Sequence, residues 1–241
     1  MPLGFVHASE QNQLHLATVG GGAVVQLASG KAVTSSIDDF WIYNFAFGVR
    51  RPLDLEEAAA AFRAAGRGYV HCWVSPSSWA GLAGQLATLG FRRVESQRCR
   101  STAGTGAGAP GLLALAPGDV GAFLAVWRAA WGRADDGKAA AVRQRYLDDR
   151  SRPFRTADGS GAFILFDAGT TSQLYHLGVA ADAQGRGTGR RMLELAAGLV
   201  PSGRPLFLLA GLGGGGDRTA AAAGWREAYV AENWLYDLEA R

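Results

Sequence analysis

The alternation of apolar and polar positions divides the first hundred residues into short strands and amphipathic helices. Residues 14–19 and 23–27 have the pattern of two strands and flank three glycines, which predicts a hairpin with a permissive turn. Asp54 followed by Glu57 has the spacing of a capping box, so a helix is expected to begin there. The elements expected in this half are strands over 14–19, 23–27, 40–49, 69–74 and 92–100 and helices over 54–65 and 79–89.

The same pattern predicts a second series of strands and helices after residue 111. Val120, Phe123, Val126, Trp127 and Ala130 form the apolar stripe typical of an amphipathic helix. The expected elements are strands over 112–116, 162–167, 172–180, 206–210 and 227–238 and helices over 119–131, 138–149, 188–200 and 218–223. Strands that alternate with helices in this way place the chain in the α/β (α+β) class.

Residues 101–111, STAGTGAGAPG, separate the two halves. The segment consists of small residues without hydrophobic periodicity, which is typical of a linker. The halves also end alike, because a helix followed by Gly90-Phe91 and a strand in the first matches a short helix followed by Gly224-Trp225 and a strand in the second. We therefore expect two related units, 1–100 and 112–241, joined by the linker.

The composition of the chain excludes several classes of protein and indicates the compartment in which it is expected. Hydrophobic residues make up 48% and charged residues 19%, which excludes disorder as the overall state. The net charge of +3 is too small to indicate a nucleic-acid-binding face. Cys72 and Cys99 lie far apart, which favours a reducing compartment over a disulfide scaffold or a zinc site. Without a signal peptide or an apolar run of about 18 residues, we expect a cytoplasmic protein with no nucleic-acid or membrane partner.

Glycine is about twice as frequent as usual, with 34 residues, and three glycines stand in one loop of the most informative stretch, Leu174–Leu195. An apolar strand ends there at Val179, the loop Gln184–Gly189 follows, and a helix begins at once. Glycines let the backbone turn sharply, while a helix start presents unpaired N–H groups and a partial positive charge. Together these features predict a cradle for a pyrophosphate.

Three phosphate-binding motifs can be compared with the chain. The dinucleotide fingerprint G-x-G-x-x-G fails because Arg190 stands at the position of the third glycine. The P-loop fails at Gly30-Lys31, because an alanine follows the lysine in place of serine or threonine. The pattern Q/R-x-x-G-x-G/A at a strand-to-helix turn fits in full, with Gln184, Gly187 and Gly189.

With this motif the chain resembles the GCN5-related N-acetyltransferase (GNAT) family over roughly residues 112–241. The resemblance includes the strand before the loop, the helix after it, the strand 206–210, and Gly224-Trp225 where the family usually has Gly-Phe. It implies a mixed β-sheet flanked by helices and splayed at the strand before the loop, with acetyl-CoA in the wedge.

The resemblance also assigns the groups that would hold acetyl-CoA. The main chain of Leu177 and Val179 would hold the acetyl and pantetheine part. The pyrophosphate would be held by the main-chain N–H groups of the loop, namely those of Gln184, Gly185, Arg186, Gly187, Thr188, Gly189 and Arg190.

The family's usual general acid and base are absent from their expected positions. Many members carry a tyrosine four residues before the Gly-Phe, where this chain has Ala220, and some carry a glutamate on the strand before the loop, where it has Gln173. His176 is a substitute, although alternation puts it on the face opposite Gln173, Tyr175 and Leu177. Further substitutes, each with a structural explanation as well, are Tyr175, Tyr229, Tyr236, Asp217 and Glu227. The catalytic residues therefore stay unassigned.

The first half lacks the glycine motif. Its strand 40–49 runs into Arg51-Pro52, and the proline forbids a tight glycine turn and removes one N–H donor. We expect a degenerate GNAT-like unit that does not bind CoA and serves as a lid, an acceptor-site wall or the surface of a homodimer. In the second half, Gly211–Gly216 is expected to be a loose connection.

The resemblance implies an acetyltransferase that moves an acetyl group from acetyl-CoA to an amine of a small molecule or peptide, without a metal. A non-catalytic acyl-CoA-binding or sensing protein is the alternative, which the missing acid and base favour. A transferase of longer acyl groups is a third reading, which the glycine-rich openings favour.

Overall fold

The computed structural model describes residues 3–19, 22–35, 44–131 and 136–239. Contacts divide the chain into two compact units, of which unit 1 comprises Met1–Arg98 and Ala228–Arg241 and unit 2 comprises Cys99–Glu227. The sequence predicted the C-terminal strand in the second unit, but most of it belongs to unit 1. Strands β5 (Arg92–Ala103) and β11 (Arg226–Asp237) each have residues in both units.

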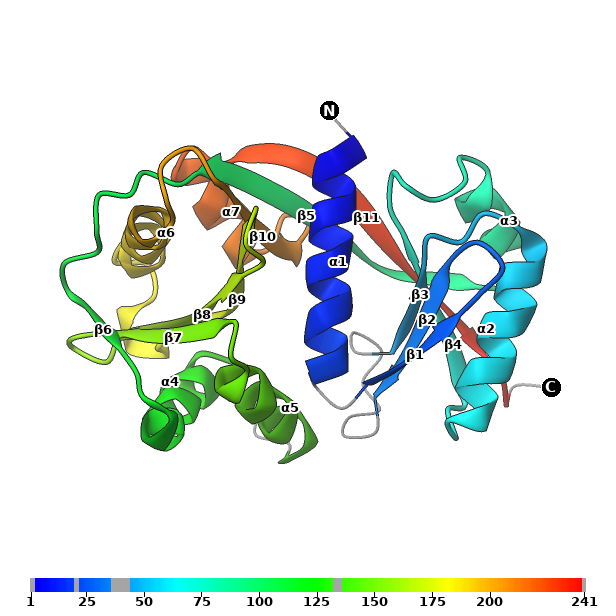
Figure 1. The fold of residues 1–241 in the computed structure, drawn as a ribbon, viewed down its shortest axis with the longest axis horizontal. Helices are drawn as coiled ribbons and strands as arrows, with labels where there is room; N and C mark the ends of the chain where they lie inside the picture. The colour runs from blue at the N-terminus through cyan, green and yellow to red at the C-terminus, as the bar shows by residue number, and fades with distance from the viewer. Residues whose placement is uncertain (1–2, 20–21, 36–43, 132–135, 240–241) are drawn as a thin grey trace. The chain divides into compact units, whose positions relative to one another are not determined.

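Unit 1 is built on strands in the order β1-β2-β3-β4-β11-β5 (Figure 1). Strands β3 and β4 are parallel, whereas the β1–β2, β2–β3 and β4–β11 pairs are antiparallel. Leu55 and Phe62 on α2 and Leu82 and Leu86 on α3 share one hydrophobic cluster with Val70 on β4. The other elements of this unit are α1 (Leu3–Val19), β1 (Gly22–Gln26), β2 (Lys31–Ser35), β3 (Phe45–Phe47), α2 (Pro52–Ala64), β4 (Tyr69–Val74) and α3 (Leu82–Thr88).

Helix α1 shows that the strand predicted over 14–19 is wrong. The buried positions among its described side chains recur at spacings of three and four residues, and they are Val6, Ser9, Glu10, Asn12, Leu16 and Ala17. Because three of these positions are polar, the face lacks the apolar periodicity by which a helix is recognised in a sequence.

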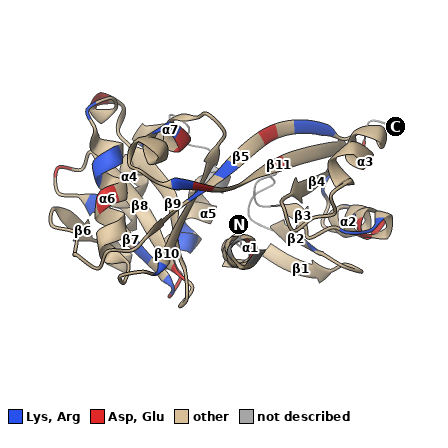
Figure 2. Cartoon of the chain, turned by 90° about the horizontal axis from the view of Figure 1, so that it is seen from above, with Lys and Arg blue, Asp and Glu red and all other residues tan. Residues whose placement is uncertain are grey.

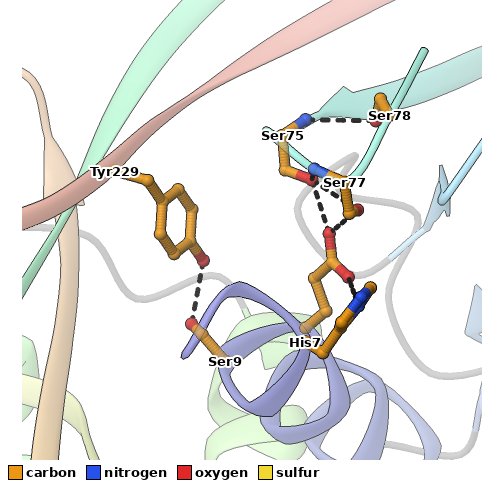
Figure 3. Close-up of polar contacts among 7 residues, drawn as sticks. His7, Ser9, Ser75, Ser77, Ser78 and Tyr229 are labelled. Carbon is orange, nitrogen blue, oxygen red and sulfur yellow. Dashed lines mark hydrogen bonds and ion pairs between the residues drawn. The ribbon is translucent and has the colours of Figure 1, made fainter. Parts of the chain in front are cut away.

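Hydrogen bonds from Ser75 and Ser77 to Glu10 hold α1 in unit 1, and Figure 3 labels the two serines and His7 around this carboxylate. The hydroxyls of Ser75 and Ser77, in the loop after β4, both donate to the Glu10 carboxylate, and the Ser75 Oγ to Glu10 Oε1 distance is 2.5 Å. His7 Nδ1 lies 3.3 Å from the other carboxylate oxygen. The buried carboxylate is thus hydrogen-bonded on both sides, as a buried charge requires.

Helix α2 begins at Pro52, two residues earlier than predicted. Proline is favoured at the first helical position because its missing N–H is not needed there. Asp54 is therefore the third residue of the helix and not its cap. Of the strand predicted over 40–49, residues 45–47 form β3, while 40–43 lie outside the described residues.

Unit 2 has strands in the order β5-β10-β9-β8-β7-β6, with α4 and α5 on one face of β7–β9 and α6 on the other (Figure 1). Its core includes Phe163 and Leu165 of β8, Leu174 of β9, and Met192 and Ala196 of α6. The elements are β6 (Leu112–Ala114), η2 (Pro117–Asp119), α4 (Val120–Trp131), α5 (Asp136–Leu147), β7 (Ser151–Thr156), β8 (Gly161–Asp167), β9 (Ser172–Val179), η3 (Ala181–Ala183), α6 (Thr188–Leu199), β10 (Pro205–Gly211) and α7 (Gly215–Ala222). The sequence pattern missed β7, whose apolar alternation is broken by two arginines and a proline.

The segment 101–111, predicted as a linker, is grouped with unit 2. Its first residues complete β5, and the rest runs along the C-terminal end of α6. Gly104 N–H donates to the Arg204 carbonyl at 2.8 Å, and Gly108 N–H donates to the Gly198 carbonyl at 3.0 Å. A Cβ added at Gly198 would lie 2.1 Å from the Gly108 carbonyl oxygen. Glycine therefore permits a close approach of two chain segments here.

The matching ends of the two halves have the same local geometry. Gly90 after α3 and Gly224 after α7 are both left-handed, with φ of 87° and 80°. Phe91 N–H donates to the Leu86 carbonyl and Trp225 N–H to the Ala220 carbonyl, each at 2.9 Å. These are the hydrogen bonds of a Schellman cap, which ends a helix and directs the chain into the next strand.

Candidate functional site

Strands β9 and β10 run parallel and then separate. Their pairing extends from Ser172–Leu206 to Leu174–Leu208. Strand β9 continues to Val179 and β10 to Gly211, with no further pairing between them in the described part of the chain. The facing edges of the two strands are therefore splayed beyond Leu174, as the family resemblance implied.

Strand β9 contains a bulge at the point where the splay begins. Its register with β8 shifts between the pair Ala162–Gly178 and the pair Ile164–Tyr175, which leaves one extra residue on β9. His176 in this segment has a φ of 50° and is the one non-glycine residue with positive φ among those described. The extra residue changes which side chains share a face.

The bulge overturns the alternation predicted for this strand. Leu177 packs against the hydrophobic cluster on the α6 side, whereas the His176 ring meets Trp127 of α4 with centroids 6.2 Å apart. The charge of Arg145 on α5 acts to lower the pKa of both Tyr175 and His176, so Arg145 lies near both side chains. The prediction that His176 faces away from Tyr175 is therefore wrong, because both side chains face the layer formed by α4 and α5.

The loop between β9 and α6 presents unbonded main-chain donors. Gly187 is the N-cap of α6, with a left-handed backbone (φ 83°) and no side-chain hydrogen bond at the cap. Among the described residues, the six N–H groups from Gly185 to Arg190 have no hydrogen-bond partner, and the next, of Arg191, donates to the Gly187 carbonyl at 3.0 Å. Such a helix start attracts an anion, so the cradle fits a pyrophosphate.

The glycines of the motif serve two different needs. Gly185 has a φ of 75°, and at both Gly185 and Gly187 a Cβ would meet open space. At these two positions glycine supplies the left-handed backbone that forms the cradle. A Cβ at Gly189 would lie 3.3 Å from Thr219 Cγ2 and 3.6 Å from Val179 Cγ2, so this glycine allows α6 to start close to the end of β9.

Two side chains of the loop fix its shape. Gln184 Nε2 donates to the Val179 carbonyl at 3.0 Å, and Thr188 Oγ1 donates to the Ala183 carbonyl at 3.3 Å. Gln184 thus ties the start of the loop to the last residue of β9. This bond explains why a side-chain amide suits the first position of the motif, which spacing alone does not show.

Arginines surround the cradle on the exposed surface. Arg190 Nε lies 2.9 Å from Glu194 Oε1, one helical turn later, and basic and acidic positions stand side by side on α6 (Figure 2). Arg186 and Arg191 are exposed as well. Exposed ion pairs contribute little to stability, so these guanidinium groups can exchange partners with a phosphate at low cost.

The tyrosines of the last strand that were considered as substitutes for the general acid have contacts within unit 1. Ala220, at the position of the family's tyrosine, is fully buried in the core cluster of unit 2. Tyr229 and Tyr236 are both assigned to unit 1. The Tyr229 hydroxyl donates to Ser9 Oγ at 2.9 Å, and the Tyr236 ring packs on Phe91.

Asp217 is a structural residue and not a substrate anchor. It is the third residue of α7 and only 2% exposed. Arg100 Nε donates to Asp217 Oδ1 at 2.5 Å, and Gly213 N–H donates to Oδ2 at 2.8 Å. This carboxylate fixes the glycine-rich segment 211–216, which was expected to be a loose connection. Glu227 is the second residue of β11 and is exposed.

Burial moves the pKa values of His176 and Tyr175 away from neutral pH, where the pKa of an effective general base lies. Burial, together with the charge of Arg145, lowers the pKa of His176 to about 3. Burial raises the pKa of Tyr175 well above its usual value, although the charge of Arg145 acts in the opposite direction. Both side chains are therefore neutral at neutral pH, where an effective general base has a pKa near the working pH.

Several solved structures resemble this chain over most of its length. A GCN5-related N-acetyltransferase from Kribbella flavida matches with a TM-score of 0.70 at 17% identity, over 98% of this chain and 95% of its own. A tandem GNAT protein from the clavulanic acid biosynthesis pathway matches with a TM-score of 0.55 at 15% identity, over 94% and 88%. The chain has the GNAT fold. A functionally unknown conserved protein from Staphylococcus epidermidis ATCC 12228 also matches, with a TM-score of 0.69 at 13% identity, over 90% and 95%.

The chain matches GNAT proteins in its three-dimensional structure. No protein-family model matches the chain, and no curated protein sequence matches it. The described residues contain no group of three or more His, Cys, Asp or Glu side chains placed to bind a metal ion. None of the described helices is long and apolar enough to cross a membrane.

Unit 1 also has a strand-to-helix turn, between β3 and α2, and the N–H groups of Arg50 and Arg51 in it are already bonded. The N–H groups of Arg50 and Arg51 donate to Asp54 Oδ2 at 2.9 Å each, and that of Ser29 donates to Oδ1 at 2.7 Å. Burial raises the pKa of Asp54, but these bonds and that from the Ser29 hydroxyl outweigh it and lower the pKa below its usual value. The carboxylate of the chain itself thus takes the position of an anionic ligand.

Proposed function

We propose that this chain is an acyl-CoA-dependent N-acetyltransferase, which moves an acetyl group from acetyl-CoA to an amine of a small molecule or peptide. The observation that carries the proposal is the set of six unbonded N–H groups from Gly185 to Arg190, placed beside the splay of β9 and β10. An acyl-CoA offers the two parts that such a site needs, a pyrophosphate for the cradle and an extended pantetheine chain for an open strand edge.

The proposed binding mode gives each part of the site one task. The main chain of Leu177 and Val179 holds the acetyl and pantetheine part, and the N–H groups from Gly185 to Arg190 hold the pyrophosphate. The Gln184 N–H, which was also expected to hold it, donates instead to the Ala181 carbonyl at 3.4 Å. A main-chain N–H of β9 near the thioester oxygen stabilises the charge that develops on it during transfer. The fit of the cradle to an anion supports this assignment.

The reaction requires a neutral amine. Its nitrogen bonds to the thioester carbon while the carbon–sulfur bond breaks, and the amine gives up one proton as the thiolate gains one. Ala220 and Gln173 can carry neither proton, and His176 is too weak a base. We therefore assign both proton transfers to water, and we assign no side chain of this site as general acid or base.

We further propose that unit 1 is a degenerate GNAT-like copy that binds no CoA. The Asp54 carboxylate bonded to the N–H groups of Arg50, Arg51 and Ser29 supports this assignment. A phosphate at this turn would be repelled by the Asp54 carboxylate, which already accepts the main-chain N–H groups that the phosphate would need.

Calorimetric titration with acetyl-CoA, followed by a thiol-release assay over a panel of amines, tests the function. Gly187→Asp places a carboxylate at the cradle, and we expect it to weaken acetyl-CoA binding at least about a hundredfold by like-charge repulsion. Gly189→Asp should act in the same direction. Gly169→Asp is the matched control, because Gly169 has the same φ of 83° and open surroundings in the β8–β9 turn. Unchanged affinity in Gly187→Asp contradicts the proposed cradle.

A non-catalytic acyl-CoA-binding protein is the second candidate. The observation in its favour is that Ala220 and Gln173 occupy the positions where the family has its acid and base. The same assay separates the two functions. Acetyl-CoA binding without release of CoA over any amine would establish the second and exclude the first.

A further inference from the structure

A group of buried polar atoms on β9 has no role in holding acetyl-CoA. Gln173 Oε1 and Nε2, the Tyr175 hydroxyl and His176 Nε2 are shielded from solvent and have no hydrogen-bond partner among the described residues. Each unsatisfied group costs about 1–3 kcal/mol of folding free energy. Native structures keep such groups where a ligand or an ordered water satisfies them, and four on one strand mark a site.

These atoms lie on one face of β9. Gln173 is paired with Phe166 on β8 and with Phe207 on β10. The Phe166 ring also contacts Tyr175, with centroids 6.1 Å apart, so Gln173 and Tyr175 share that face. The bulge adds His176 to it, against Trp127 of α4. The cluster therefore stands where β10 leaves β9, next to the strand edge proposed for the thioester.

The Arg145 guanidinium acts on this cluster. Arg145 on α5 is only 1% exposed, and its guanidinium lies close enough to Tyr175 and His176 to act on the titration of both. Tyr175 and Gln173 offer hydrogen-bond donors in the same place. A carboxylate accepts from such donors and is attracted by the arginine, whereas an additional cationic group is repelled.

We propose that Gln173 and Tyr175 form the acceptor-binding wall and select an amine that carries a carboxylate close to its nitrogen, such as an α-amino acid. This inference rests on the proposed acetyltransferase function. The carboxylate accepts from the Tyr175 hydroxyl and the Gln173 amide, which places the amine beside the thioester. The positive charge of Arg145 also disfavours the ammonium form of the amine, which helps to supply the neutral nucleophile that the reaction needs.

Matched pairs of substrates test the selection. Each α-amino acid is compared with the amine that remains when its carboxylate is removed, for example phenylalanine with phenethylamine and leucine with isoamylamine, by thiol release from acetyl-CoA. We expect kcat/KM at least about tenfold higher for the amino acid of each pair. Equal or faster turnover of the decarboxylated amines, or of diamines, overturns the proposal, as does failure to turn over any amino acid.

Two variants test the named residues. Tyr175→Phe and Gln173→Met remove the polar atoms with little change of volume, and each should raise KM for the amino acid about tenfold or more while the Kd for acetyl-CoA stays within about twofold. Tyr236→Phe in unit 1 is the matched control. Because the Tyr175 hydroxyl has no partner in the described fold, Tyr175→Phe should keep or raise the Tm without acceptor. A lower Tm with unchanged KM would show a structural role and overturn the proposal.

The two levels of inference fail in different ways. Absence of acetyl-CoA binding overturns the proposed function and the acceptor wall together. Acetyl-CoA binding with turnover that ignores the carboxylate overturns the acceptor wall alone and leaves the function in place.

Discussion

Gly178 is a residue at which the packing of α4 on β9 depends on the absence of a side chain. It lies on β9 just after the bulge, and α4 crosses it closely. A Cβ at this position would lie 2.8 Å from the Ala130 Cβ and 3.6 Å from Trp131 Nε1. Its glycine therefore sets the distance between α4 and the acceptor face of β9.

We predict that Gly178→Ala lowers the unfolding free energy by about 1–3 kcal/mol, because α4 must move away to accept the methyl group. Chemical denaturation measures the change. Gly84→Ala is the control, since Gly84 lies inside α3 with nothing within 4 Å of its added Cβ, and alanine should stabilise a helix interior by roughly 0.5–1 kcal/mol. Equal effects of the two substitutions would contradict the close packing at Gly178.

His176 makes stability depend on pH. Its pKa is lowered to about 3 by burial and by Arg145, so between this value and its usual 6.5 the unfolded chain binds a proton that the folded chain does not. The folded state should therefore lose stability as the pH falls from 6.5 toward 3, by at most about 1.4 kcal/mol per pH unit from this residue.

His176→Asn should flatten that dependence, and asparagine tolerates the left-handed backbone at this position. Denaturation curves of both proteins at several pH values between 4 and 7 check it. A wild-type slope that the substitution leaves unchanged would show that His176 is not held neutral.

At the scale of elements, α7 and the glycine-rich segment before it are held by one buried ion pair. Arg100 on β5 donates to Asp217 on α7 and also, through Nη1, to the Trp225 carbonyl at 3.2 Å. Asp217 in turn accepts the Gly213 N–H. The pair therefore joins β5 to α7 and to the glycine-rich segment before it, although Arg100 and Asp217 are 117 residues apart in the sequence.

Arg100→Met leaves the Asp217 carboxylate buried without its cation, and we predict a loss of about 3–5 kcal/mol in unfolding free energy. Arg93→Ala is the control, because its pair with Glu232 at 2.7 Å lies on the surface and should contribute less than about 1 kcal/mol. A thermal-denaturation series of both variants checks the contrast. Comparable losses would mean that burial of the Arg100 pair is not what fixes α7.

The whole molecule has two units of related build but one unbonded cradle. Strand, helix, strand, Schellman-capped helix and strand follow one another in β3–α2–β4–α3–β5 and in β9–α6–β10–α7–β11. Their strand-to-helix turns differ in what bonds the main-chain N–H groups. In unit 1 the Asp54 carboxylate does so, while in unit 2 those N–H groups have no partner among the described residues.

We therefore predict one acetyl-CoA bound per chain. Calorimetric titration gives the stoichiometry, and Gly187→Asp should remove the single binding event. Two binding events per chain, or one that survives Gly187→Asp with unit 1 intact, would contradict the assignment of the cradle to unit 2.

Local sequence features predicted much of this architecture. Most strands and helices of unit 2 lie within a few residues of their predicted bounds, because their apolar periodicity is strong and glycine or proline marks their ends. Helix α1 was missed because its buried face carries Ser9 and Glu10, whose polar partners come from distant parts of the chain. Strand β7 was missed because its pairing with β8, and not its own pattern, makes it a strand.

The sequence by itself determined the fold class, the repeated helix ends and the glycine motif before α6, because each depends on neighbours within a few residues. The tertiary structure decided the rest. The bulge at His176, the return of the last strand to unit 1 and the bonding of Gln184 to Val179 depend on which strands pair and where the register shifts. The acceptor wall is of this second kind, because burial and the approach of α5 decide that Gln173 and Tyr175 have no partner in the described fold.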